Sequence, residues 1–179
     1  MKMKIGILIL AVFLCLLAAC TSTDRPEQEQ AEQQEVFQSI NYSVPCNWVK
    51  DKTSNNGVYY TVDEEKESYF DIDYEENVLE SKNDDESKKD YFEEVRNSLR
   101  ASEKKGDISN VKISKIDQKY PYCLIQYDYI YNKQKGTIYV CDAIMFIGTD
   151  CYAFSFSTKD RSDINIYLNV VNSVMEKSQ

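Results

Sequence analysis

"TIYVCDAIMFI", residues 137–147, decides the fold because its side chains are apolar on both faces of a strand. A strand of this kind lies in the centre of a sheet and is covered on each side. Gly148, Thr149 and Asp150 then form a short turn into Cys151–Ser157, "CYAFSFS". Such a short loop joins antiparallel neighbours, because parallel strands need a long crossover. The stretch therefore predicts a central antiparallel hairpin, with small Cys151, Ala153 and Ser155 on one face, where something can pack closely.

Alternating apolar side chains predict further strands on both sides of this hairpin. In Ser68–Glu75, "SYFDIDYE", Phe70, Ile72 and Tyr74 fall on one face, which is typical of a strand with one covered side. The loop "NKQKG", residues 132–136, is short enough for a hairpin. We expect the other strands at Val36–Val44, Val58–Asp63, Val111–Ile116 and Leu124–Tyr131.

Two segments change to a helical period. Tyr91, Phe92, Val95 and Leu99 recur at spacings of three and four within the stretch before Gly106, and this indicates an amphipathic helix. Apolar residues from Ile164 to Met175 follow the same period and predict a C-terminal helix. The order of elements predicts one α+β domain over residues 36–179, with an antiparallel sheet of about six or seven strands sandwiched by helices.

The first residues have the composition of a signal peptide. Lys2 and Lys4 precede a short apolar run, Ile5–Leu17, and small residues follow it. The run has about 13 residues, whereas a membrane-spanning helix needs about 20. We expect a signal peptide over residues 1–19; the start of a short membrane anchor is the weaker alternative.

Leu17-Ala18-Ala19-Cys20 resembles the lipobox of bacterial lipoproteins. The resemblance implies cleavage just before Cys20 and a diacylglycerol on its sulfur, which would hold the protein on the extracytoplasmic face of a bacterial membrane. The alternative is an ordinary signal peptide with a chance cysteine. Polar Thr21–Glu35 holds no large apolar residue, so we expect residues 20–35 to be a disordered tether.

Composition argues against several classes of function. The net charge of −9 becomes −11 once the two lysines of the signal peptide are removed, which argues against a nucleic-acid partner. The chain has no histidine, so it lacks the commonest general base and metal ligand. We expect no cofactor and a monomeric domain.

The segment Ile40–Lys50, "INYSVPCNWVK", carries a second resemblance. An extended segment followed by Pro45, two residues and Trp48 resembles the start of PsbP domains, named after the extrinsic photosystem II protein. The mid-chain helix, the four later strands and the final "DINIYLNVVNSV", residues 163–174, are similar as well. A Ran-binding nuclear import factor and bacterial lipoproteins of unknown role share this domain. The resemblance covers about Val36–Lys177 and implies an α/β/α sandwich that binds proteins rather than catalyses a reaction; it supplies no site residue.

Four cysteines, Cys46, Cys123, Cys141 and Cys151, belong to the domain. An even number outside the cytoplasm allows disulfides, with three possible connectivities. The alternative is four small thiols buried among the strands. Because no CxxC occurs, a redox or zinc motif has no support.

Two strand faces are candidate binding surfaces. Asp71, Asp73 and Glu75 share one face and form either a weak calcium site or a solvated strand face. The other candidate is a tyrosine face that begins at Ile125. It is either an exposed platform for sugars or peptides or, as we expect, part of the core, so that truncating Tyr129 to Ala costs on the order of 3 kcal/mol or more. Its rings belong to Tyr127, Tyr129 and Tyr131.

Catalysis has little support, because no Ser, Cys or Thr has a histidine to activate it. We expect a membrane-anchored extracytoplasmic lipoprotein that binds a protein or another envelope component. The alternative is a small hydrolase that uses paired carboxylates, and two close, buried carboxylates in a pocket would favour it.

Overall fold

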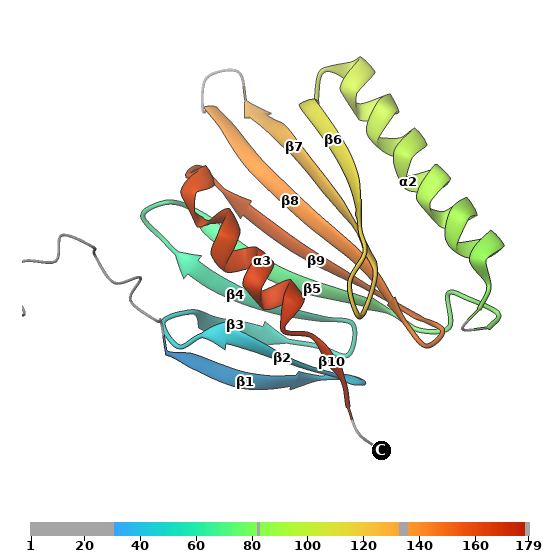
Figure 1. Ribbon diagram of the computed structural model, residues 1–179. Helices are drawn as coiled ribbons and strands as arrows, with labels where there is room; N and C mark the ends of the chain where they lie inside the picture. Colours follow the sequence, from blue (N-terminus) through green and yellow to red (C-terminus); the bar gives the residue numbers. More distant parts are fainter. Residues whose placement is uncertain (1–30, 82, 133–135, 178–179) are drawn as a thin grey trace, which may run out of the picture. The chain divides into compact units, whose positions relative to one another are not determined.

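The computed structural model describes residues 31–81, 83–132 and 136–177, without the side chains of residues 131 and 132. A seven-stranded antiparallel sheet has the order β3-β4-β5-β9-β8-β7-β6, and a three-stranded sheet has the order β1-β2-β10 (Figure 1). The helices are α2 (Asp85–Lys105), α3 (Ile164–Asn172) and the short 3-10 helix η1 (Arg161–Asp163). The strands are β1 Glu32–Phe37, β2 Ile40–Pro45, β3 Val49–Thr53, β4 Gly57–Asp63, β5 Ser68–Glu75, β6 Ile108–Ile116, β7 Tyr122–Asn132, β8 Gly136–Ile147, β9 Asp150–Thr158 and β10 Met175–Glu176.

The predicted central hairpin is confirmed as β8 and β9. Their register pairs Ala143 with Phe154, and β7 and β5 flank the hairpin on its two sides. Alternation along β9 directs three aromatic rings to one face and small side chains to the other. Tyr152, Phe154 and Phe156 are fully buried. The sheet therefore has one face filled with aromatic rings.

Helix α3 and the three-stranded sheet cover this aromatic face. Tyr167 of α3 is fully buried; its ring stacks on Phe156 with centroids 5.4 Å apart, and its hydroxyl donates to the carbonyl of Phe154 at 3.0 Å. Trp48, in the loop after β2, packs on Phe70. The main core therefore lies on the side that faces the viewer in Figure 1, where α3 crosses the sheet.

Helix α2 packs on the opposite face. The side chain of Asp84 caps its start by accepting from the backbone N–H of Ser87 at 2.9 Å, and Gly106 ends it in the left-handed conformation with φ 76°. Its apolar stripe contacts a second, smaller cluster that includes Ile125, Ile144 and Phe146. With a helix on each face of the sheet, the domain is the expected α+β sandwich.

Several boundaries differ from the prediction: strand β3 was not expected, β6 and β7 are longer than expected, and three further differences alter the ends of the domain. The expected strand Val36–Val44 is a hairpin, because Gln38 adopts φ 53° and turns the chain between β1 and β2. Polar residues from Glu32 onward pair in β1, so the tether predicted up to residue 35 ends earlier and the domain begins at Glu32. The C-terminal helix ends at Asn172, because the following residues pair with β2 as β10.

Among the described residues, no helix combines the length and apolar character needed to cross a membrane.

Candidate functional site

Cys20, the predicted lipid-bearing residue, lies outside the described residues, as do the signal peptide and most of the tether. The four domain cysteines are free thiols, so the disulfide alternative is not realised. Cys141 and Cys151 are both buried but lie on opposite faces of the sheet, since Cys141 belongs to the main core and Cys151 to the cluster under α2. Cys46 is exposed, and Cys123 is half-buried in the α2 cluster.

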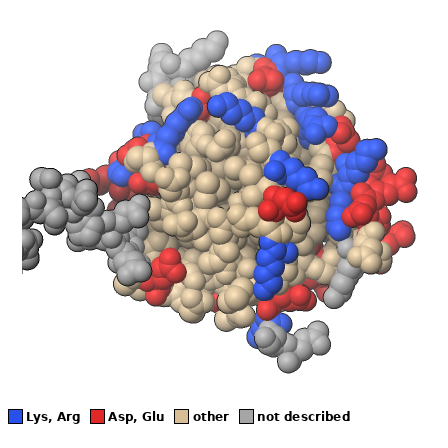
Figure 2. Space-filling view, in the orientation of Figure 1, with Lys and Arg blue, Asp and Glu red and all other residues tan. Residues whose placement is uncertain are grey.

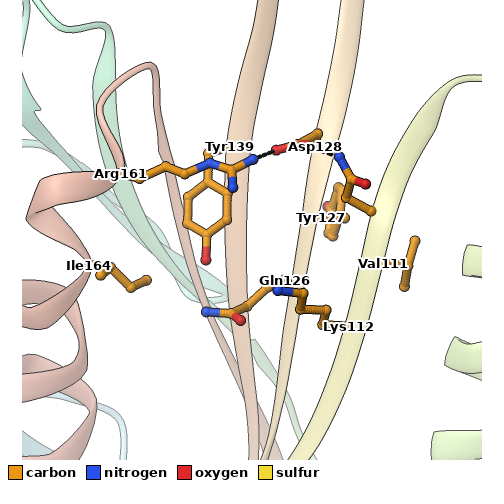
Figure 3. A pocket seen from close by; sticks show the side chains of 9 residues that line it. Val111, Lys112, Gln126, Tyr127, Asp128, Tyr139, Arg161 and Ile164 are labelled. Atoms are coloured by element: carbon orange, nitrogen blue, oxygen red, sulfur yellow. Dashed lines mark hydrogen bonds and ion pairs between the residues drawn. The ribbon is translucent and has the colours of Figure 1, made fainter.

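A cleft of about 580 Å³ opens on the face that carries α3 (Figure 3). One wall comes from strands β6, β7 and β8, and the other comes from η1 and the start of α3. On the face shown in Figure 2, a central area without charged side chains is bordered by charged side chains at the upper, right-hand, lower and left margins. The lining residues are Asn110, Val111, Lys112, Gln126, Tyr127, Asp128, Tyr139, Arg161 and Ile164.

Arg161 is fixed at the mouth of this cleft. Its guanidinium pairs with the carboxylate of Asp128 and lies over the Tyr139 ring, 4.7 Å from the ring centroid (Figure 3). A bulge in β6 and the positive φ of Asn110, 57°, bring the Asn110 amide to the same carboxylate, to which it donates at 2.7 Å. Asp128 is only 6% exposed, so these two donors satisfy a nearly buried charge.

The remaining polar groups of the cleft are suited to binding. Burial raises the pKa of the Tyr139 phenol to about 12, so it stays a hydrogen-bond donor at neutral pH. Gln126 donates to the sulfur of Cys141 at 3.9 Å, and burial raises the pKa of that thiol to about 12. A thiol at that pKa is not a nucleophile at neutral pH. The cleft thus offers a guanidinium, an ammonium on Lys112 and an amide, but no activated nucleophile.

Sequence reasoning missed this cleft because its charged residues come from β6, β7 and η1, which are far apart in the chain. The one local signal was "KDRSD", residues 159–163, where an arginine sits in a capped helix start.

The predicted acidic strand face lies on the other side of the sheet, toward α2. Asp71 is half-buried, whereas Asp73 and Glu75 are exposed. The structure adds a carboxylate that the sequence analysis overlooked: Asp71 pairs with Ser155, and Ser155 pairs with Asp142 of β8. Asp71 and Asp142 therefore lie in one row, separated by one strand with a small side chain.

Burial and mutual repulsion perturb both carboxyl groups. Burial, followed by repulsion from Asp73 and Asp142, raises the pKa of Asp71 to about 7. Burial raises the pKa of Asp142 to about 6, although hydrogen bonding by Ser155 and Tyr127 opposes the rise. The Oδ1 atom of Asp142 is buried without a hydrogen-bond partner among the described residues.

The described residues contain no cluster of three carboxylate or thiol side chains that could hold a metal ion together. Asp71, Asp73 and Glu75 share a face but differ in burial, because Asp71 lies in the middle of the sheet and Glu75 at the end of β5. Calcium at these residues stays a prediction.

The expectation that the whole tyrosine face is core is wrong. Ile125 is buried and Tyr127 is half-buried in the α2 cluster, but Tyr129 is 40% exposed. The apolar stripe of α2 ends at Leu99, and the polar last turn of the helix leads directly to Ile108, the residue that pairs with Tyr129. The side chain of Tyr131 lies outside the description.

No family model matches the sequence, and no curated protein matches it. Solved structures do share the fold. Cyanobacterial PsbP from Synechocystis superposes with a TM-score of 0.60 at 12% identity, covering 82% of this chain and 93% of that protein.

A crystal structure from Bacteroides thetaiotaomicron gives a TM-score of 0.53 at 10% identity and covers 84% of this chain; this chain spans only 50% of its length. PA94 from Pseudomonas aeruginosa, a protein of unknown function, gives 0.46 at 10% identity, covering 83% of this chain and 99% of that one. The superposition on the Synechocystis protein over most of both chains shows that this chain has a PsbP-like α/β/α fold.

Proposed function

We propose that the chain is a lipid-anchored binding module on the extracytoplasmic face of a bacterial membrane, and that it binds a protein or another envelope component through the cleft at Arg161. The observation that carries the proposal is the fixed guanidinium of Arg161 in an open cleft that lacks an activated nucleophile. A guanidinium held in this way can bind the oxygen acceptors of a ligand.

The guanidinium is preorganised for a partner. Asp128 and Tyr139 hold its position, yet the Arg161 side chain stays 61% exposed, so N–H groups remain for a ligand. Guanidinium groups suit carboxylates and other oxygen acceptors, because their donors form a planar fork. Lys112 adds a second exposed cation to the lining of the cleft. An acidic or acceptor-rich segment of the partner fits this arrangement.

Capture from native envelopes by the tethered protein tests the cleft. We expect cross-linking followed by quantitative mass spectrometry to recover a partner with the parent chain. Arg161→Gln should deplete it by about tenfold or more, since a charge-assisted hydrogen bond contributes about 1.5–3 kcal/mol. Arg100→Gln is the matched control, because Arg100 is exposed on α2, away from the cleft.

Lys112→Gln is a second variant in the cleft and removes a charge from an exposed side chain. It should weaken capture without changing thermal stability. A set of captured components that is the same for the parent, Arg161→Gln and Lys112→Gln would overturn the cleft proposal.

The anchor rests on Leu17-Ala18-Ala19-Cys20 and has its own test. The intact mass of the native protein should correspond to a mature start at Cys20 plus lipid, and Cys20→Ala should release the folded domain from the membrane. A mature start elsewhere without added lipid would contradict the anchor.

One observation favours the hydrolase alternative. Asp71 and Asp142 are two perturbed carboxyl groups in one row of the sheet. Glycosidases use such pairs as acid and base. The cleft, however, lies against the other face of the sheet, and neither Asp71 nor Asp142 lines it. Turnover of a glycoside, lost in both Asp71→Asn and Asp142→Asn, would establish the alternative in place of binding.

A further inference from the structure

The sheet face toward α2 is only partly covered. The apolar stripe of α2 packs over the cluster of Ile125, Ile144 and Cys151. Beyond this cluster, the same face continues over β9, β5 and β4, where Tyr69 is 45% and Tyr59 is 39% exposed. We name the residues in the middle of this open part, Asp71, Asp73, Asp142 and Ser155, the acidic strip.

Strand pairing brings the acidic strip together. Asp71 of β5 and Asp142 of β8 both pair with Ser155 of β9, so a small hydroxyl separates two carboxylates. Asp73 follows Asp71 by two residues and accepts a hydrogen bond from the Tyr59 hydroxyl at 3.4 Å. Gly57 leaves room for this contact, because a Cβ there would lie 3.0 Å from the Tyr59 oxygen. Strand pairing thus holds the carboxylates of the strip close together, with the Tyr59 ring beside them.

The strip lacks a compensating cation. None of the ion pairs between described residues involves its three carboxylates. Arg96 of α2 acts on the neighbouring thiol of Cys123 and is already paired with Glu93. The other groups that face the strip are neutral hydroxyls: Tyr127 from β7, Ser155 from β9 and Tyr59 from β4.

One of the two carboxylate oxygens of Asp142 lacks a hydrogen-bond donor in the described part of the chain, although Ser155 and Tyr127 bond to this carboxyl group. Its Oδ1 atom is buried and accepts no hydrogen bond among the described residues. A buried carboxylate oxygen without a donor is costly, and native proteins rarely keep one without a functional reason. The raised pKa values of Asp71 and Asp142 have the same origin, namely burial and repulsion without a balancing positive charge.

We propose that the acidic strip docks a lysine or arginine side chain of a partner protein, whose N–H groups bond to the half-buried Asp71 and bring positive charge beside Asp142, while Tyr59 and Tyr69 flank the cation. Such a cation supplies the positive charge that the strip lacks, and tyrosine rings attract cations. The exposure of both tyrosines makes this an open surface rather than an enclosed pocket, and enclosure is what a small free amine needs. A protein segment, in contrast, shields the bound side chain from water with its own neighbouring residues. This site is separate from the cleft at Arg161, and its test does not depend on that proposal.

The probe is a capped decapeptide of alternating lysine and glycine, with a lysine-to-glutamine version as its control. We expect calorimetric titration at pH 7.5 and low salt to detect the lysine peptide only. Asp71→Asn and Asp142→Asn should each weaken binding by about tenfold or more. Asp90→Asn, which removes the same charge from the exposed surface of α2, should leave binding within about twofold of the parent.

The pH dependence adds a readout that a purely structural role does not give. Binding needs ionised carboxylates, so affinity should fall from pH 8 to pH 5.5, with protons released on binding near pH 6.5. Both asparagine variants remove repulsion and should stay folded. Equal loss in Asp90→Asn, no binding by the parent, or equally tight binding of free spermidine or calcium chloride would each overturn the proposal.

Discussion

The two faces of the seven-stranded sheet differ in whether their buried polar groups have hydrogen-bond partners. On the α3 face, the buried hydroxyls are paired: Tyr42 with Tyr60 at 2.8 Å, and Tyr167 with a backbone carbonyl at 3.0 Å. On the α2 face, Asp142 keeps a buried oxygen without a partner among the described residues, and none of the ion pairs between these residues offsets Asp71. The difference indicates that the first face holds the fold together, whereas the second retains polar groups at a cost in stability.

The largest effect should separate the two faces at neighbouring residues of β5. Phe70 is fully buried against Trp48 and Tyr167, whereas Tyr69 points to the open face. Phe70→Ala should lower the free energy of unfolding by about 3–5 kcal/mol, because it leaves a cavity in the core. Tyr69→Ala should change it by no more than about 0.5 kcal/mol. Urea denaturation measures both; similar losses would remove the distinction between the faces.

The acidic strip should stabilise the protein when its charge is removed. The folded pKa values of Asp71 and Asp142 lie above the ordinary 3.8, so the folded state binds more protons than the unfolded state between about pH 4 and pH 7. Stability contributed by the protonated groups is therefore lost as pH rises through this window. Asp71→Asn should raise the free energy of unfolding at pH 7.5 by about 1–3 kcal/mol and flatten its pH dependence. A lower stability than Asp90→Asn at that pH would show that the carboxylate is compensated.

Arg161→Gln tests whether the cleft on the α3 face contributes to stability as well as binding. Asp128 would keep only the Asn110 amide as a partner for a nearly buried charge. We expect a loss of about 1–2 kcal/mol, smaller than for a fully buried pair because the Arg161 side chain is mostly exposed. A thermal melt beside Arg100→Gln measures it, and matching melting temperatures would mean that the pair is solvent-screened.

A small effect is expected at Tyr129, at the edge of the cover that α2 provides. Its exposure implies that Tyr129→Ala costs no more than about 1 kcal/mol, in place of the core-sized loss that the sequence suggested. A shift of the denaturation midpoint as large as that of Phe70→Ala would show that the Tyr129 ring is part of the core.

The sequence predicted the fold well because its main signals are local. The apolar run at Thr137–Ile147 and the helical stripe from Tyr91 to Leu99 required no knowledge of distant contacts. The hairpin at Gln38 was missed, because a single residue with positive φ inside a β-like stretch breaks no periodicity.

The candidate sites were harder to predict, because each depends on strand register. The acidic face of β5 was visible from alternation, but its partner Asp142 was hidden inside the most apolar strand of the chain. A single carboxylate within such an apolar run is the feature of the sequence that indicates this site. Arg161 and Asp128 are 33 residues apart, and only the tertiary fold brings them together.

The most direct test of the contrast between the faces is a pH titration of the carboxyl carbons of Asp71 and Asp142 by nuclear magnetic resonance, in the absence and presence of the lysine–glycine peptide. Without the peptide, both midpoints should lie well above the ordinary 3.8, near pH 7 and pH 6. With a saturating amount of peptide, both should fall by about one unit, because a bound cation favours the ionised form. Ordinary midpoints without peptide, or midpoints that the peptide leaves unchanged, would contradict the account.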